Sequence, residues 1–198
     1  MKRLMDLFLS LCILALFLPF GLLLSLCIVL ESRGGVFYRQ ERIGRNGQPF
    51  KLIKFRSMRP NADRDGKLTV GERDPRVTRV GTFIRKYKLD EFPQFINVLK
   101  GEMSVVGPRP EVVEYVRQYS DEQRRVLDFK PGITDLASIT YFEENKLLAN
   151  AADPQQTYVE EIMPEKIRIN LAYQTNATVL SDLGVVWKTA WRMVRKSS

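Results

Sequence analysis

The longest hydrophobic feature of the chain is an uncharged apolar run from Leu7 to Leu30. At about 1.5 Å per residue, a helix of this length can cross the roughly 30 Å hydrocarbon core of a bilayer. Pro19 and Gly21 stand at its middle, where proline removes a backbone donor and kinks a helix. The run therefore predicts a membrane helix that is broken near Pro19.

Basic residues lie on both sides of this run. Lys2 and Arg3 precede it, and four arginines follow it: Arg33, Arg39, Arg42 and Arg45. Basic flanks stay on the cytoplasmic side of a membrane, so both ends favour the same side. Residues 1–32 are therefore expected to form a re-entrant helix that enters and leaves by one leaflet. A kinked helix that spans the bilayer is the alternative, because transmembrane helices tolerate proline.

Residues 33–198 show the mixed pattern of one α+β domain. The strand-like runs VFYRQERIG and PFKLIKFRSM flank an Asn46-Gly47 pair, which predicts a tight β-hairpin with a basic face. Residues 60–78 are polar and rich in Pro, Gly and Asp, so we expect a loop there.

The rest of the domain reads mainly as helix. Two short helices are predicted over 82–88 and 91–99, the second closed by Gly101, and an amphipathic helix is predicted to reach about residue 128. Near the C-terminus, Trp187 and Trp191 are spaced i, i+4 among basic residues, which favours a helix lying on an anionic membrane surface. Packing of both tryptophans in the core is the alternative. We expect a helix-dominated α+β fold with amphipathic helices at the bilayer surface.

The composition of the chain limits the partners and the types of catalysis that suit it. The 198 residues carry a formal net charge of +8, which suits an anionic partner: nucleic acid, an acidic membrane or a phosphorylated substrate. The chain has no histidine, which excludes Ser-His-Asp and Cys-His catalysis and the common zinc sites that contain histidine. Acid-base chemistry must then use carboxylates, lysine or tyrosine. Nucleic acid is the least favoured partner, because no nucleic-acid-binding motif appears.

Two adjacent acids, Asp90 and Glu91, follow a cationic stretch that contains Arg85 and Lys88. One interpretation is structural: Asp90 is a helix N-cap and Glu91 a first-turn acid that complements the helix dipole. The other is functional, because an ionised carboxylate can bind Mg²⁺ or attack an electrophile covalently. The pattern by itself allows both.

Arg109 stands between two prolines in the sequence VGPRP. The prolines restrict the backbone, and the planar guanidinium group suits bidentate recognition of phosphate. A rigid turn with an exposed arginine is the alternative.

Taken in order, these features match a known pattern. An apolar segment interrupted by proline, KFRSM, GTFIRKYKLDEFPQFINVLKGEMSVVGPRPE and KPGIT follow one another along the chain. This order resembles the monotopic phosphoglycosyl transferases, the small single-domain type of the bacterial sugar transferase family. The resemblance covers essentially the whole chain, and the combined pattern is far more specific than any of its pieces.

The resemblance implies an enzyme at the cytoplasmic face of the bacterial inner membrane. Such an enzyme transfers a sugar-1-phosphate from a UDP-sugar to a polyprenol phosphate, such as undecaprenyl phosphate, releases UMP and initiates surface glycan assembly. Asp90 would be the nucleophile, acting with bound Mg²⁺ through a covalent phospho-sugar intermediate, and Glu91 would be a general base or a supporting group. By motif position, the candidates for substrate binding are Lys54, Arg85, Arg109 and Asp182.

The chain also departs from the family pattern. Leu18 precedes Pro19 where many members have serine, and PGIT continues as DLASITYFEENKLL instead of into a tryptophan and a Gly-Arg-Asn segment. Sugar recognition is expected to vary in that segment, so the sugar is left open, as are a role for Asn170 and a homodimer. A non-catalytic, basic, membrane-associated scaffold is the alternative function.

Overall fold

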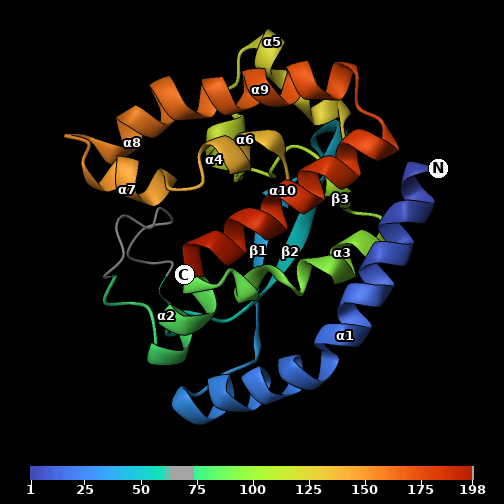
Figure 1. Cartoon of the computed structure of the whole chain (residues 1–198). Helices are drawn as coiled ribbons and strands as arrows, with labels where there is room; N and C mark the ends of the chain where they lie inside the picture. The colour runs from blue at the N-terminus through green and yellow to red at the C-terminus, as the bar shows by residue number, and fades with distance from the viewer. Residues whose placement is uncertain (61, 63–73, 198) are drawn as a thin grey trace.

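The computed structural model describes the whole chain except residues 61, 63–73 and 198, and it is dominated by helices (Figure 1). The predicted loop 60–78 therefore lies largely outside the described residues. The helix-dominated α+β fold is confirmed. The described α-helices are α1 (Lys2–Glu31), α2 (Arg79–Lys86), α3 (Gln94–Lys100), α4 (Val113–Val116), α5 (Asp121–Arg124), α6 (Leu136–Thr140), α7 (Glu144–Ala149), α8 (Pro154–Thr157), α9 (Met163–Thr175) and α10 (Val179–Ser197).

The predicted hairpin is present. Strands β1 (Phe37–Ile43) and β2 (Pro49–Phe55) pair antiparallel, with Ile43 opposite Pro49 at the turn. Asn46 and Gly47 both have positive φ, at 56° and 74°, which is the conformation that these two residue types tolerate best. On the other edge of β2, the Asn97 amide of α3 accepts from Ile53 N at 3.0 Å and donates to Lys51 O at 2.9 Å. The hairpin is thereby fixed to α3.

A second small sheet brings two sequence motifs together. Strands β3 (Ser104–Val106) and β4 (Gly132–Thr134) pair in parallel, so VGPRP, which begins at the last residue of β3, lies beside KPGIT, which contains β4. Gly132 N donates to Pro108 O at 2.9 Å, and a Cβ on Gly132 would lie 2.1 Å from Gly107 N. The close approach of the two backbones therefore requires glycine.

Helix α1 is continuous through Pro19, so the predicted break does not interrupt the helix. Figure 1 shows instead that the helix changes direction partway along its length. A proline removes one hydrogen bond and can bend a helix without ending it. By length and composition, α1 is the one helix among the described residues that could cross a membrane.

The N-terminal end of α1 is docked on the rest of the protein by charged side chains. Asp6 accepts hydrogen bonds from Ser104 Oγ at 2.9 Å and Val105 N at 3.0 Å, and Arg3 donates to Val98 O at 2.6 Å. Lys2 forms an ion pair with Asp182 on α10. The N-terminal end of α1, just before the apolar run, therefore contacts α3, β3 and α10.

The C-terminal end of α1 is attached to the same domain. Glu31 accepts from Arg79 N at 2.6 Å and Val80 N at 2.9 Å at the start of α2. Arg56, which directly follows β2, donates to Ser32 O at 2.7 Å and Arg33 O at 2.8 Å. Both ends of the helix are thus held by one folded domain.

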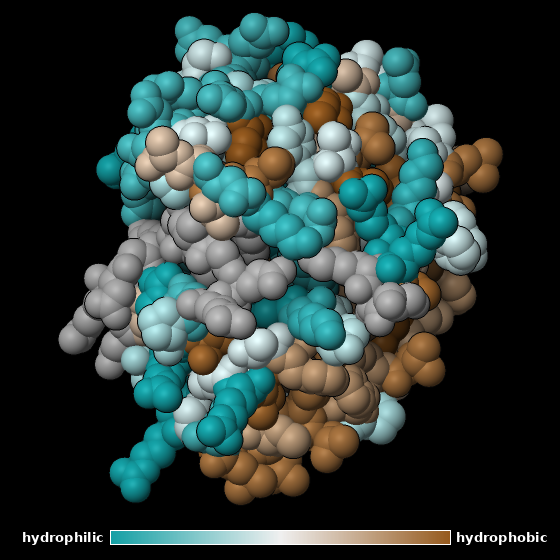
Figure 2. Space-filling model, turned by 60° about the vertical axis from the view of Figure 1, so that its left-hand side comes forward, coloured by the Kyte–Doolittle hydropathy of each residue, from teal (hydrophilic) through white to brown (hydrophobic). Residues whose placement is uncertain are grey.

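Most apolar side chains between these two ends are exposed. Figure 2 shows an apolar area at the bottom of one face, at the level where α1 lies in Figure 1. The exposed large apolar residues of α1 between Phe8 and Leu30 are Phe8, Leu11, Leu16, Leu18, Phe20, Leu22, Leu23, Leu26, Val29 and Leu30. Such a contiguous apolar surface on a soluble protein marks a contact with a membrane or a partner.

Two helix predictions need correction. The amphipathic helix expected up to residue 128 is divided into α4, α5 and a 3₁₀ turn over 125–128, because Ser120 and Gln123 form a capping box that starts a new helix. On α10, Trp187 and Trp191 are 69% and 54% exposed, so the core-packing alternative is wrong. Their stacked rings, with centroids 6.4 Å apart, form an exposed aromatic surface.

Candidate active site

Asp90 and Glu91 lie in a 3₁₀ turn, η3 (Leu89–Glu91), between α2 and α3. The prediction that Asp90 is the N-cap of the next helix is wrong: α3 begins at Gln94, and its N-cap is Pro93. The helix does end at Gly101, as predicted, with a φ of 86°. Lys88 adopts left-handed backbone at φ 57°, which separates the acidic turn from α2. Left-handed backbone is uncommon for a residue with a side chain, and such positions concentrate at functional sites.

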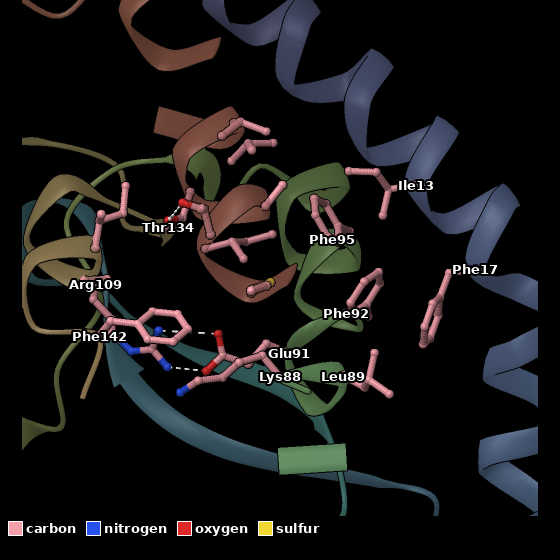
Figure 3. Close-up of a pocket in the computed structure, with 18 of the residues that line it drawn as sticks. Ile13, Phe17, Lys88, Leu89, Glu91, Phe92, Phe95, Arg109, Thr134 and Phe142 are labelled. Carbon is pink, nitrogen blue, oxygen red and sulfur yellow. Dashed lines mark hydrogen bonds and ion pairs between the residues drawn. The ribbon is translucent and has the colours of Figure 1, made fainter. Parts of the chain in front are cut away.

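Two cations from distant parts of the chain hold Glu91. Arg109, from the VGPRP motif, donates to Glu91 Oε1 and, at 3.4 Å, to Oε2 (Figure 3). Lys54 of β2 places its Nζ 3.7 Å from Glu91 Oε1. The fold therefore brings together Lys54, Glu91 and Arg109, three of the residues selected from the sequence.

The charges of Glu91, Arg109 and Lys54 shift one another's pKa values. Burial opposes ionisation of Glu91, but the positive charges of Arg109 and Lys54 outweigh it and hold the Glu91 pKa well below its usual value. The pKa of Arg109 is raised, mainly by Glu91. Burial lowers the pKa of Lys54 to about 8, although the Glu91 charge opposes that fall. Glu91 is thus a fixed anion, whereas Lys54 titrates near neutral pH.

Asp90 has a different environment from its neighbour. Burial raises its pKa, the Lys54 charge opposes that rise, and the Glu91 charge adds to it. Its Oδ1 atom is buried and makes no hydrogen bond within the part of the chain that the structure describes. Asp90 therefore has a buried carboxylate oxygen without a hydrogen-bond partner among the described residues.

The other two predicted binding residues lie outside this cluster. Arg85 is on α2, where its charge is among those that oppose the rise in the Asp90 pKa, after Lys54 and Lys88. Asp182 is fully buried on α10, where it pairs with Lys2 and accepts a hydrogen bond from Tyr173 at 2.7 Å. Its contacts attach α1 to α10.

A cavity of about 660 Å³ opens beside Glu91 and Arg109. One end is polar, and the other is lined by apolar residues of α1, α3 and α10 (Figure 3). The apolar lining includes Ile13, Leu16, Phe17 and Phe20 of α1, Phe92 and Phe95 beside them, and Val186, Ala190 and Met193 of α10. The volume suits a small organic ligand, and α1 itself forms one wall.

Several residues of the site gave no signal in the sequence. Glu144 and Lys166 line the polar part of the cavity as an ion pair, with Nζ 2.7 Å from Oε2. Glu111, directly after VGPRP, accepts a hydrogen bond from Tyr158 and pairs with Arg42 at 3.5 Å, so it fixes the arginine loop to β1. Pairs so far apart in the sequence meet only through the tertiary fold.

Comparison with known proteins agrees with this geometry. Residues 1–196 match the model of the protein family described as bacterial sugar transferase. The chain is 37% identical over 193 residues to the UDP-N-acetylgalactosamine-undecaprenyl-phosphate N-acetylgalactosaminephosphotransferase of Aeromonas hydrophila, covering 95% of this chain and 42% of that protein. It is 37% identical over 201 residues to the UDP-glucose:undecaprenyl-phosphate glucose-1-phosphate transferase of Klebsiella pneumoniae, covering 100% of this chain and 41% of that protein.

A shorter relative is matched over more of its length. The chain is 34% identical over 203 residues to the exopolysaccharide production protein ExoY of Rhizobium meliloti (strain 1021), covering 95% of this chain and 83% of that protein. The chain therefore spans about two fifths of the two longer relatives and most of the shorter one.

Proposed function

Because the chain belongs to the bacterial sugar transferase family, we propose that it transfers a sugar-1-phosphate from a UDP-sugar to undecaprenyl phosphate and releases UMP. The observation that carries this proposal is the Asp90-Glu91 turn beside Lys54 and Arg109, at a cavity with one polar and one apolar end. Cations stabilise phosphate groups, and the apolar wall suits a prenyl chain. Both substrates can therefore reach one site.

The proposed reaction has two displacements. The Asp90 carboxylate attacks the phosphorus that bears the sugar, a P–O bond to UMP breaks, and UMP leaves with that electron pair. An oxygen of undecaprenyl phosphate then attacks the same phosphorus, the bond to Asp90 breaks, and the carboxylate is restored. A covalent intermediate replaces one difficult transfer by two easier steps. The buried Oδ1 of Asp90, which has no hydrogen-bond partner among the described residues, supports this role.

Glu91 acts in this scheme as a positioning residue. A general base must gain a proton near neutral pH, and the lowered pKa of Glu91 makes it a poor one. Its carboxylate instead fixes Arg109 and Lys54, whose donors would face the diphosphate oxygens. Of the two roles expected for Glu91, we therefore propose the supporting one.

The residues present also fit a magnesium ion. Asp90 has an unpaired buried oxygen, and carboxylate oxygens are suitable Mg²⁺ ligands. The described residues form no group of three or more acidic, cysteine or histidine side chains that could enclose a metal. Asp90 would therefore hold the ion with few protein ligands, an arrangement that Mg²⁺ accepts when waters and substrate phosphates complete its shell. When bound, Mg²⁺ would neutralise charge on the diphosphate oxygens.

We further propose that residues 1–32 enter and leave the membrane by its cytoplasmic face and that residues 33–198 form the catalytic domain. Both ends of α1 contact the same domain, through Lys2 and Asp6 at one end and Glu31 at the other. These contacts support a path in which both ends of α1 stay on one side of the bilayer. The exposed Trp187 and Trp191 of α10 would then lie at the interface.

The direct test is UMP release by the purified protein in detergent, with a panel of UDP-sugars, with and without Mg²⁺ and undecaprenyl phosphate. We expect repeated turnover, measured as UMP release, to depend on both additions and to fall by at least about 10³-fold in Asp90→Asn. Asp121→Asn, which removes an exposed acid on α5, is the matched control and should retain activity. Folded protein that releases no UMP from any UDP-sugar would favour a non-catalytic scaffold.

A further inference from the structure

The ion pair between Glu144 and Lys166 takes no part in the proposed chemistry, yet it lines the same cavity as Glu91 and Arg109. Glu144 is the first residue of α7, and Lys166 lies in the first turn of α9, just after the π-helical turn η5 (Tyr158–Ile162). The two side chains are only 24% and 11% exposed. π-Helical turns are rare and often accompany functional sites.

The pair lies close to the phosphate-binding end. Glu91 is the main charge that raises the pKa of Arg109, and Glu144 is a further contributor. Lys166 and Arg109 also line a small adjoining cavity of about 20 Å³, together with Asn170. Asn170 Oδ1 is buried and makes no hydrogen bond within the described residues. A ligand whose phosphate lies at Arg109 would place the group attached to that phosphate near Glu144 and Lys166.

The charges indicate what that group is. A second phosphate is disfavoured, because Glu144 would repel it. An alkyl chain is disfavoured, because it would remove water from two ions without replacing their hydrogen bonds. A neutral group with several hydroxyls satisfies both partners, since a hydroxyl can donate to the carboxylate and accept from the ammonium group. Ser138 and Tyr141 line the same cavity.

The named relatives differ in the sugar that they transfer, so some residues must distinguish one sugar from another. The Aeromonas hydrophila relative is named for N-acetylgalactosamine and the Klebsiella pneumoniae relative for glucose, although both names describe transfer to undecaprenyl phosphate. Residues that handle the phosphates alone cannot tell these sugars apart. Glu144 follows KPGIT within the segment where the chain departs from the family pattern.

We infer that the Glu144–Lys166 pair binds hydroxyl groups of a neutral hexose and thereby sets which UDP-sugar the chain accepts. This inference rests on the proposed function. The pair is a specificity determinant. A sugar whose hydroxyls match the pair would be stabilised by its hydrogen bonds, whereas a sugar with differently placed hydroxyls would leave the buried charges without those bonds.

The test measures kcat/KM for a panel of UDP-sugars in Glu144→Gln and Lys166→Met, together with the Kd for UDP and the KM for undecaprenyl phosphate. Loss of a hydrogen bond to a charged group predicts a roughly 10- to 100-fold fall in kcat/KM for the preferred UDP-sugar and a smaller fall for the others. The Kd for UDP and the KM for the lipid should change by less than about twofold. Glu165→Gln and Arg168→Met are matched controls, because they remove an exposed ion pair from the same helix.

Other patterns of loss in these variants would count against the inference. Weaker binding of UDP, with equal losses for all UDP-sugars, would assign the pair to the phosphates, and a change confined to the KM for undecaprenyl phosphate would assign it to the lipid. If the single variants do not fold, the double variant Glu144→Lys/Lys166→Glu keeps an ion pair while exchanging its charges. An unchanged order of UDP-sugar preference in that variant would overturn the inference while leaving the proposed function intact. If the unaltered protein acts on no UDP-sugar, the proposed function and the inference fail together.

Discussion

Lys2, the second residue of the chain, forms an ion pair with Asp182 on the last helix. Asp182 is fully buried and also accepts a hydrogen bond from Tyr173, whereas Lys2 remains 40% exposed. Lys2 Nζ donates to Val106 O at 3.0 Å as well. The first helix is therefore attached to the domain next to the strand that leads into VGPRP.

Removing the Lys2 charge should destabilise the protein. In Lys2→Met, Asp182 is left buried with only Tyr173 as a described partner, at a cost of about 2 kcal/mol in the free energy of unfolding. For a chain of this size, Tm should fall by roughly 4–8 °C, measured by thermal unfolding in detergent. Lys100→Met, at an exposed lysine of α3, is the control. Equal Tm values for both variants would show that the ion pair contributes nothing to stability.

Cysteine labelling tests the proposal that both ends of α1 lie on the cytoplasmic side of the membrane. Cys12 and Cys27 are first changed to alanine, and single cysteines are then placed before Met1 or introduced as Arg33→Cys. In sealed membrane vesicles with the cytoplasmic face outward, an impermeant thiol reagent should label both positions, because both ends of α1 contact one domain. Labelling at only one of the two positions would indicate a helix that spans the bilayer.

The contact between Glu91 and Arg109 predicts strong coupling in a double-mutant cycle. Glu91→Gln leaves Arg109 and Lys54 without their shared anion, and Arg109→Met leaves Glu91 with Lys54 alone. Each change should lower the free energy of unfolding by about 3 kcal/mol, and the double variant should lose less than the sum, by about 1–3 kcal/mol. Chemical denaturation in detergent measures all four proteins. Strictly additive losses would mean that the pair does not interact in solution.

The pKa of Lys54, about 8, predicts a decline in activity at moderately alkaline pH. Below pH 8 the ammonium group is charged and can attract phosphate; as the pH rises through 8 it loses its proton, so kcat/KM should fall. On the acidic side of the profile, kcat/KM should rise with increasing pH, because Asp90 becomes ionised there and burial raises its pKa. A pH profile of kcat/KM reports the groups of the free enzyme. Arginine stays protonated, so an active Lys54→Arg enzyme should not show the fall in kcat/KM near pH 8. A fall that persists in this variant would be due to another group.

The two tryptophans report directly on α10, because the chain has no others. If Trp187 and Trp191 lie in the membrane interface, lipids brominated on their acyl chains should quench their fluorescence strongly when the protein is in vesicles. Trp187→Phe and Trp191→Phe show which ring is quenched. Unquenched emission in brominated vesicles, from protein that remains in the vesicle fraction, would place α10 away from the bilayer.

Features that depend on local chemistry can be predicted from the sequence. The apolar run of α1, the Asn46-Gly47 hairpin turn and the Gly101 helix end follow from neighbouring residues, and the structure contains all three. The ordered motifs around Asp90 and Arg109 identified the family before any contact was known. These signals are local because hydrophobic periodicity, turn geometry and capping act within a few residues.

Which charged side chains meet depends on the tertiary structure. A helix N-cap is one of the two interpretations of Asp90 from the sequence, but the left-handed backbone of Lys88 is followed by a separate turn that contains Asp90. One buried oxygen of Asp90 has no hydrogen-bond partner among the described residues. Asp182, a candidate binding residue by motif position, pairs with Lys2. Glu144 and Lys166 meet at the cavity although their sequence pattern predicts no contact. Hydrogen bonds and ion pairs depend on distances of a few ångströms, and for residues far apart in the chain those distances are set by the packing of whole helices and strands.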